Sequence, residues 1–266
     1  MAGCDTETQH LEAGSLKLEI YPTQEAAGAA AANAAAKALQ ELGERNETFG
    51  VIFATGASQI DTLRTLIAIP DLPWDRVRGF HMDEYIGMAA DHPASFRHYL
   101  REKLTGKVRM REFSEVDGTA PNLEQECREY AAKLRAANPQ LCLLGIGENG
   151  HLAFNDPGIA DFNDPVDMKI VQLDRVCRQQ QAAEGWFESF EDVPKQAMTL
   201  TIPTLLRVPK LIVSVPGSRK AHIVRRTIEE SISTECPATI LRIHPDATIY
   251  LDSESAAELP GMTRSS

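Results

Sequence analysis

The chain has 266 residues, with 27 Lys and Arg against 38 Asp and Glu, which gives a formal net charge of −11. An acidic surface repels a polyanion, and no run of Lys or Arg supplies a local basic patch, so the sequence predicts no nucleic-acid partner. A hydrophobic content of 43% and a charged content of 24% are typical of a globular protein and exclude a disordered or fibrous chain.

The sequence also predicts no membrane partner. No window approaches the ~20 apolar residues that a membrane span needs, and Met1–Gly14 lacks the charged-then-apolar order of a signal peptide, which favours a cytoplasmic location. The cysteines are odd in number and scattered, with no C-x-x-C pair and no His at ligand spacing. We therefore expect reduced thiols and no metal site at Cys4, Cys127, Cys142, Cys177 and Cys236.

Short apolar runs alternate with helix-like segments along most of the chain. After a polar leader at residues 1–14, Leu16–Tyr21 predicts a strand, and the Ala-rich Gln24–Gly43 predicts a packed helix. Further strands are predicted at Gly50–Thr55, Arg76–Met82, Leu141–Gly145, Lys169–Leu173, Ala197–Ile202, Lys210–Val215 and Ala247–Asp252. Further helices are predicted at Gln59–Ile69, His92–Leu104 and about Ser218–Glu230.

This alternation predicts an α/β fold with a doubly wound, mostly parallel sheet and helices on both faces, similar to a Rossmann fold. No Pro/Gly/Ser linker and no internal repeat divides the chain, so we expect a single domain over residues 15–258, followed by a polar tail at 259–266. Ligands of such sheets bind outside the carboxyl ends of the strands. The residues just after each strand are therefore the candidates for chemistry.

The first such loop is Thr55-Gly56-Ala57-Ser58, where a buried strand turns into a helix. A helix N-terminus offers unpaired N–H groups and a positive dipole end to an anion, and the two hydroxyls add donors. The loop lacks the Gly-Lys-Ser/Thr ending of a Walker motif. Phosphate binding and a plain structural turn, with Ser58 as N-cap and Gly56 as turn glycine, are both open at this point.

Two adjacent acids, Asp83 and Glu84, follow the strand predicted at Arg76–Met82. If one of them points into the crevice, burial raises its pKa and suits it to act as a general base. The alternative is that both are solvated turn residues.

The segment Gly145–Gly150 matches the dinucleotide fingerprint G-x-G-x-x-G, but that fingerprint must open a helix. Here the turn sequence Asn155-Asp156-Pro157-Gly158 follows within a few residues and ends any helix. We therefore expect a tight loop that presents His151 beside Asn149 and Asp156, where the imidazole can carry a proton. A structural His bonded to the backbone is the alternative.

The loop Pro216–Lys220 repeats the strand-turn-helix arrangement of the first loop. Lys220 in the first helical turn opposes the helix dipole unless an anion is bound there. The alternative is a solvated surface lysine.

Taken together, these loops resemble the glucosamine-6-phosphate deaminase/isomerase family, which includes the 6-phosphogluconolactonases. The MDEY and AFNDP segments resemble the deaminase branch. The matching segments, in the family's order, are FATGAS (Phe53–Ser58), FHMDEYIG (Phe80–Gly87), HPASF (His92–Phe96), GIGENGHLAFNDPG (Gly145–Gly158), VPGSRKA (Val215–Ala221) and HPDATIYLD (His244–Asp252).

The resemblance implies an enzyme that converts an amino-sugar phosphate to a ketose phosphate and ammonia. Asp83 would move a proton from carbon 2 to carbon 1 of the opened sugar, with Glu84 in an orienting role. His151, supported by Asn149 and Asp156, would assist ring opening. The implied phosphate site is Thr55, Gly56, Ala57, Ser58 and Lys220, and the chain of proton transfers needs no metal or organic cofactor.

Three positions depart from the family pattern as this resemblance gives it. Asn149 stands where the family usually has Asp, and Asp156 where it usually has Glu. A phosphate-binding Arg aligns near Gln181, with Arg178 as a candidate substitute. The missing charge predicts that Asn149→Asp raises turnover.

Two other functions stay open: lactone hydrolysis of the 6-phosphogluconolactonase type, and sugar-phosphate binding with weak or lost activity. A homo-oligomer is also open, since no sequence feature fixes the oligomeric state.

Overall fold

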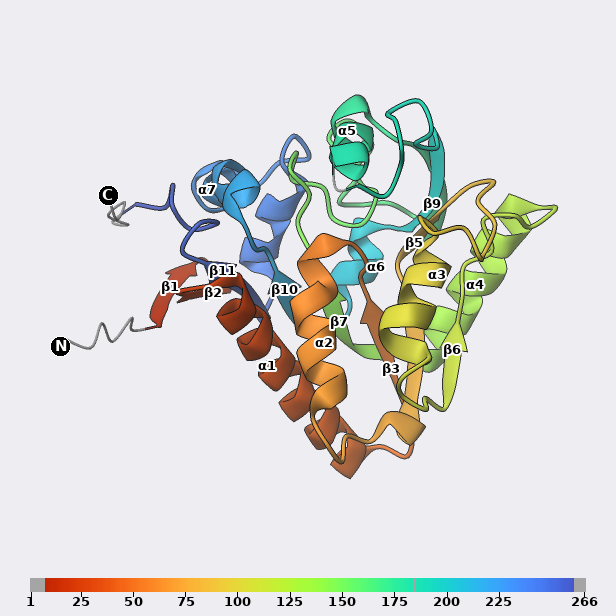
Figure 1. Ribbon diagram of the computed structural model, residues 1–266, viewed down its shortest axis with the longest axis horizontal. Helices are drawn as coiled ribbons and strands as arrows, with labels where there is room; N and C mark the ends of the chain where they lie inside the picture. The colour runs from red at the N-terminus through yellow and green to blue at the C-terminus, as the bar shows by residue number, and fades with distance from the viewer. Residues whose placement is uncertain (1–7, 184, 261–266) are drawn as a thin grey trace.

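The computed structural model describes residues 8–183 and 185–260, and it is built on an eight-stranded sheet (Figure 1). The strand order is β1-β2-β11-β10-β7-β3-β4-β6. All neighbours pair in parallel except β1 and β2, which are antiparallel. The strands are β1 (Gln9–Ala13), β2 (Leu16–Tyr21), β3 (Phe49–Phe53), β4 (Val77–His81), β6 (Glu112–Ser114), β7 (Pro139–Leu144), β10 (Lys210–Ser214) and β11 (Ala247–Asp252).

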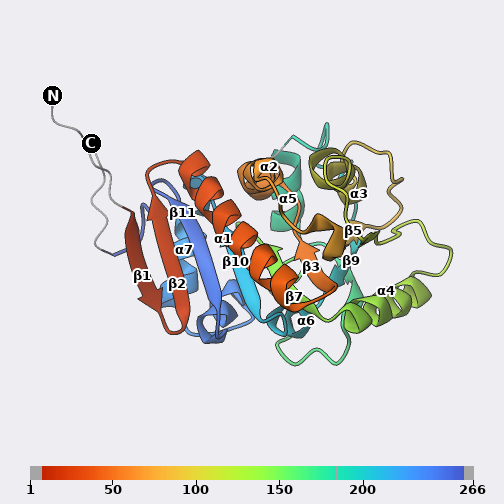
Figure 2. The same ribbon diagram turned by 90° about the horizontal axis from the view of Figure 1, so that it is seen from below.

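Helices cover both faces of this sheet. In Figure 2, α2 (Ile60–Ala68) and α3 (Phe96–Leu100) lie above the strands, and α4 (Leu123–Ala137) and α6 (Ile202–Leu206) lie below them. The helix α1 (Gln24–Arg45) packs with α2, and α7 (Ala221–Glu229) packs on the face of α4 and α6. The predicted fold class, a doubly wound and mostly parallel sheet in one domain, is confirmed.

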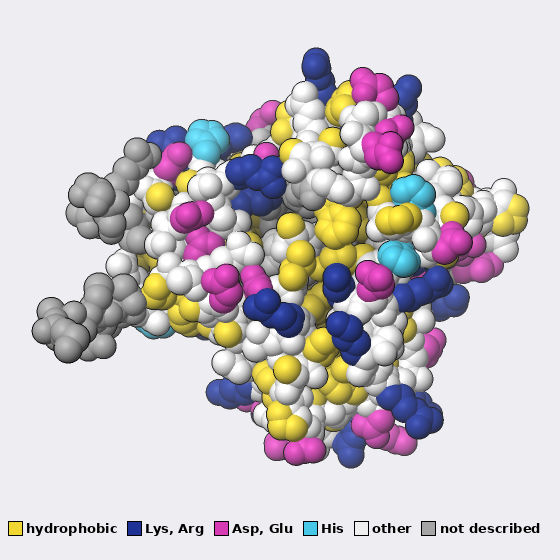
Figure 3. Space-filling view, in the orientation of Figure 1, with side chains coloured by type: hydrophobic (Ala, Val, Ile, Leu, Met, Phe, Trp, Pro, Cys, Tyr) yellow, Lys and Arg dark blue, Asp and Glu magenta, His cyan; other side chains and the backbone are white. Residues whose placement is uncertain are grey.

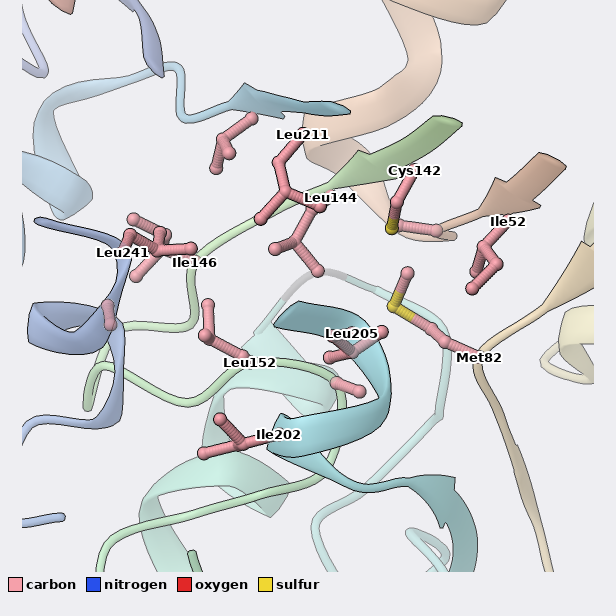
Figure 4. Close-up of a cluster of buried hydrophobic side chains, with 14 of the residues drawn as sticks. Ile52, Met82, Cys142, Leu144, Ile146, Leu152, Ile202, Leu205, Leu211 and Leu241 are labelled. Atoms are coloured by element: carbon pink, nitrogen blue, oxygen red, sulfur yellow. The ribbon is translucent and has the colours of Figure 1, made fainter. Parts of the chain in front are cut away.

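Successive strand residues feed the two hydrophobic cores, because side chains alternate across a sheet. Val51 and Phe53 of β3 pack with α1 and α2, whereas Ile52 between them packs with the opposite core. Figure 4 shows part of that opposite core, where Ile52, Cys142 and Leu144 from the strands lie near Ile202 and Leu205 of α6. This two-sided burial explains why the central strands are almost continuously apolar.

A second sheet of three antiparallel strands, in the order β5-β9-β8, was not foreseen. It consists of β5 (Asp83–Tyr85), β9 (Gln196–Leu200) and β8 (Met168–Gln172). The strands predicted at Lys169–Leu173 and Ala197–Ile202 therefore form β8 and β9 of this second sheet, and their expected place in the central sheet is wrong. An apolar run indicates a buried strand but not its partner, and the chain leaves the central sheet after β4 to pair with β9 instead.

The ends of the chain also differ from the sequence expectation. Residues 9–13 of the predicted leader form β1, which turns at Gly14 (φ +64°) into β2, so the ordered fold begins before residue 15. Residues 1–7 of the leader, including Cys4, and residues 261–266 of the predicted tail lie outside the described residues. The other four cysteines are buried and free, as expected.

The charge distribution on the surface and the length of the helices concern binding to nucleic acids and to membranes. On the face shown in Figure 3, Lys and Arg side chains are interspersed with Asp and Glu and form no continuous basic patch. Among the described residues, every helix is too short or too polar to cross a bilayer.

The strand order places a topological switch between β3 and β7. From β3 the chain continues outward to β4 and β6, whereas β7 continues in the other direction to β10 and β11. The loops that follow β3 and β7 therefore diverge, and they open a crevice at the carboxyl ends of these strands. Any ligand site of this fold is expected there.

Candidate active site

A cavity of about 300 Å³ lies at this switch point. Seven of the predicted site residues line it: Thr55, Gly56, Ala57, Ser58, Asp83, His151 and Lys220. Sequence reasoning missed other lining residues, among them Gln24, Phe96, Gly145, Gly147, Phe154, Gln180, Ser218, Arg219 and Glu254. Gln24 and Glu254 lie in no recognisable motif, and they reach the cavity only because distant segments of the chain fold together.

Two loops of the same shape form one wall of the cavity. Gly56 after β3 and Gly217 after β10 both have φ +89°, a left-handed conformation that favours glycine. Each is followed by a 3-10 turn whose N-cap glycine has no side chain to cap it, and at the second turn the Gly217 N–H donates to Oδ2 of Asp252 at 2.7 Å. The alternative in which Ser58 is an N-cap is therefore wrong, since Gly56 and Gln59 hold the N-cap positions of the turn and of α2, and the backbone N–H groups at these turns suit an anion.

Lys220 enters the same cavity from the second loop. Only 7% of its surface is exposed, and its Nζ donates to the Ile146 carbonyl oxygen at 2.8 Å. The alternative of a solvated surface lysine is therefore wrong. Its neighbour Arg219 also lines the cavity and has its Nε 3.3 Å from Oε1 of Glu148.

The two adjacent acids separate because they belong to one strand, β5, whose side chains alternate in direction. Asp83 lines the cavity, whereas Glu84 does not. The Asp83 side chain is buried, and its Oδ1 has no hydrogen-bond partner within the described part of the chain. Burial, with a further contribution from the Glu84 charge, raises the pKa of Asp83 well above its usual range. A carboxylate in this state is a strong proton acceptor.

Glu84 is fully buried and holds α3 in place. Its two oxygens accept hydrogen bonds from the Ser95 hydroxyl at 2.7 Å and from the backbone N–H groups of Tyr85, Phe96 and Arg97. Its Oε2 also lies 3.3 Å from Nε of Arg97, which is itself buried. These contacts agree with an orienting role and leave Glu84 outside the catalytic group.

We expect Glu84→Gln to destabilise the fold by about 2 kcal/mol, because it removes the charge that several buried donors share. Urea denaturation measures this loss. Glu112→Gln, which breaks the more exposed Arg78–Glu112 pair at 3.2 Å, should cost less than about 1 kcal/mol. Unchanged stability with lost turnover would instead assign Glu84 to the chemistry.

His151 is held by two acceptors at one ring nitrogen. Its Nδ1 lies 2.8 Å from Oδ1 of Asn149 and 3.0 Å from Oδ1 of Asp156. Two acceptors facing Nδ1 require a proton there, so in the neutral ring Nε2 keeps its lone pair. The structure thus brings together His151, Asn149 and Asp156, as the sequence predicted.

The Asp156 carboxyl is buried yet charged. Burial raises its pKa, but the hydrogen bond and charge of His151 and the Asn149 amide outweigh that effect and lower the pKa below its usual range. Asp156 therefore supplies the negative charge that Asn149 lacks. Within the described residues, His151, Asp156 and Cys177 offer ligand-type atoms within 4.8 Å of one another, but the Nδ1 proton and the Asp156 carboxylate already satisfy each other.

Gly147 makes room for the imidazole. A Cβ at this position would lie 2.1 Å from Cε1 of His151, a distance at which the ring must move. The second glycine of the G-x-G-x-x-G segment therefore serves the packing of a histidine rather than a dinucleotide.

Position 181 carries an amide where the resemblance places a phosphate-binding Arg. Gln181 lines the cavity, and its Oε1 accepts the Tyr85 hydroxyl proton at 2.8 Å. Arg178 points elsewhere: its guanidinium donates to the carbonyl oxygens of Phe190 and Val193 and stacks on the Phe190 ring at 4.2 Å. Arg178 is therefore no substitute, and the cavity cations among the described residues are Arg219 and Lys220.

Comparison with known proteins agrees with this geometry. The family model described as glucosamine-6-phosphate isomerases/6-phosphogluconolactonase matches residues 22–250. The chain belongs to this family. It is 34% identical over 229 residues to glucosamine-6-phosphate deaminase of Listeria innocua serovar 6a, covering 85% of this chain and 96% of that one.

Solved structures of the family show the same fold. A monomeric glucosamine-6-phosphate deaminase is 30% identical, with a TM-score of 0.84 over 91% of this chain and 99% of that chain. The 6-phosphogluconolactonase of Thermotoga maritima is 19% identical, with a TM-score of 0.71 over 88% of this chain and 99% of that chain. The second likeness concerns the fold alone.

Proposed function

We propose that the chain is a glucosamine-6-phosphate deaminase that converts glucosamine 6-phosphate and water to fructose 6-phosphate and ammonia. One observation carries the proposal. The cavity at the switch point holds a buried carboxylate (Asp83), one oxygen of which has no partner among residues 8–183 and 185–260. It also holds a histidine of fixed tautomer (His151) and a buried lysine (Lys220) beside two turns that begin with glycine. The family relatives that are named deaminases support the same reaction.

The proposed reaction begins with phosphate binding and ring opening. The phosphate would accept hydrogen bonds from the N–H groups of Thr55–Ser58 and from Lys220. Nε2 of His151 would then accept the proton of the carbon 1 hydroxyl and return it to the ring oxygen. The Nδ1–H bond to Asp156 stabilises the imidazolium that forms in between.

Asp83 would then carry out the isomerisation. Its carboxylate takes the proton from carbon 2 while the ammonium group at carbon 2 gives a proton to the carbon 1 oxygen, which forms an enolamine. Asp83 then returns its proton to carbon 1, which gives a protonated imine at carbon 2. Water adds to this imine and ammonia leaves, so one water is consumed for each ammonia released. The steps are ring opening, proton transfers, addition of water and loss of ammonia, and none requires an organic cofactor or a metal.

The decisive experiment incubates the purified protein with glucosamine 6-phosphate and measures ammonia and fructose 6-phosphate. We expect both products in equal amounts and none from unphosphorylated glucosamine. Hydrolysis of 6-phosphogluconolactone, assayed in parallel, would instead support the lactonase reaction, and binding without turnover would support a sugar-phosphate-binding protein. A cytoplasmic location, without nucleic-acid or membrane partners, is part of the proposal.

A further inference from the structure

Asp174 joins the histidine network to the helix that bears the cavity glutamines. It directly precedes α5 (Arg175–Ala183), and its Oδ1 accepts the Cys177 N–H at 2.6 Å, as an N-cap does. Its other oxygen, Oδ2, accepts from Nδ2 of Asn149 at 3.1 Å. Its own N–H donates to Oδ2 of Asp156 at 3.3 Å. Asp174 thus contacts both residues that face the His151 imidazole.

The orientation of the Asn149 amide is fixed by four contacts with three residues. Its Oδ1 accepts the His151 backbone N–H at 3.0 Å and the Nδ1 proton at 2.8 Å. Its Nδ2 donates to Oδ1 of Asp156 at 2.9 Å and to Oδ2 of Asp174. In a flipped amide, the NH₂ group would face the two N–H groups of His151, and the oxygen would face the carboxylates of Asp156 and Asp174. Only the observed orientation therefore satisfies the network.

The same contacts show what an acid at position 149 would meet. In Asn149→Asp, an oxygen would replace Nδ2 at 2.9 Å and 3.1 Å from two carboxylate oxygens. Like charges at such distances cannot all stay ionised. The structure therefore argues against the expectation that this substitution simply restores a missing charge.

We propose that Asp174 is a positioning residue for His151, and that the Asn149 amide is matched to it. The carboxylates of Asp156 and Asp174 each accept one hydrogen bond from the amide NH₂ of Asn149. These two bonds hold the amide oxygen and Asp156 against Nδ1 of His151. Asp156 supplies the negative charge at the imidazole, and Asp174 fixes the amide that shares the Nδ1 proton with it. The inference rests on the proposed function in one respect, that His151 assists ring opening.

A charge exchange tests the matching. We expect kcat to fall by about tenfold or more in Asn149→Asp and in Asp174→Asn, since coupled polar groups interact by one to two powers of ten in an equilibrium constant. KM should change little, because neither residue lines the cavity. In the double variant Asn149→Asp/Asp174→Asn, an oxygen at position 149 again faces an amide N–H at position 174, although it still lies 2.9 Å from Asp156. Its kcat should therefore recover above that of Asn149→Asp but stay below that of the original protein.

The controls separate charge from folding. Asn caps a helix as well as Asp, but an amide at position 174 loses the contact with Nδ2 of Asn149. Asp174→Asn should therefore lower the melting temperature less than Asp174→Ala, which loses both the cap and that contact. Asn122→Asp makes the same chemical change at the exposed N-cap of α4, where Asn122 accepts the Gln125 N–H at 3.0 Å. That variant should keep the kcat of the original protein.

A second readout does not depend on turnover. The ¹⁵N chemical shifts of His151, assigned with a His151→Gln variant, should report a proton on Nδ1 in the original protein and the double variant. They should report mixed tautomers in the two single variants. An inactive original protein with these shifts would overturn the proposed deaminase function but not the positioning role. Single variants with unchanged kcat and shifts, or a double variant no better than Asn149→Asp, would overturn the positioning role.

Discussion

Asp83→Asn is expected to lower kcat by a factor of about 100 to 10,000, the usual contribution of a positioned general base. An amide has nearly the same shape as the carboxylate, so sugar-phosphate binding should persist. Exchange of the carbon 2 hydrogen with solvent deuterium, followed by NMR, isolates the step in question. Persistent exchange in a folded Asp83→Asn protein would move the role of base to another residue.

The same substitution is expected to stabilise the fold, with a defined pH dependence. The pKa of Asp83 is raised on folding by burial and by Glu84, so the ionised carboxyl favours the unfolded chain. The contribution of Asp83 to stability is therefore fully present below the unfolded pKa and is lost as the pH rises toward the folded value. Asp83→Asn removes this loss, so its advantage in free energy of unfolding should grow as the pH increases from about 4.

A matched control makes the comparison sharper. Asp71→Asn is the same chemical change at an exposed position with φ +57°, a conformation that Asn tolerates well. It should change neither kcat nor the pH dependence of stability. If both variants stabilise the fold equally at every pH, burial of the Asp83 charge is not the cause.

The central features of the site follow from sequence because parallel strands end at one edge of a sheet. Once the apolar runs at β3 and β10 are assigned as parallel strands, the loops at Thr55–Ser58 and Pro216–Lys220 are expected at the same edge of the sheet. The strand order then brings the two loops close together, because only β7 lies between β3 and β10. The direction of Asp83 relative to Glu84 follows from strand alternation, but only after residue 83 is known to lie in a strand. That strand is three residues long and has no apolar alternation of its own.

The features that the sequence does not predict depend on contacts between residues that are distant along the chain. Asp174 shows no sign of function in its own segment, and its role appears only when the loop of Asn149 is folded against it. Arg178 was a reasonable candidate by proximity, but the carbonyl groups of residues 190 and 193 bind its guanidinium. The antiparallel sheet was missed for a related reason, since the pairing of β8 with β9 is a choice between strands that look alike in sequence.

Lys220→Met is expected to weaken binding of glucosamine 6-phosphate by about 10- to 100-fold, the usual value of a hydrogen bond to a charged group. Met keeps the apolar stem, so the buried packing around this side chain is largely preserved. Binding of unphosphorylated glucosamine should change little, because it lacks the phosphate that we propose Lys220 binds. Isothermal titration calorimetry with both sugars measures the difference.

Arg219→Ala gives the comparison within the same loop. Its side chain is 51% exposed and paired with Glu148, so water screens its charge and its loss should weaken phosphate binding less than the loss of Lys220. A competition series with inorganic phosphate should rank the two variants in the same order. Equal losses for the phosphorylated and unphosphorylated sugars in Lys220→Met, or a larger effect of Arg219→Ala, would mean that the phosphate lies elsewhere in the cavity.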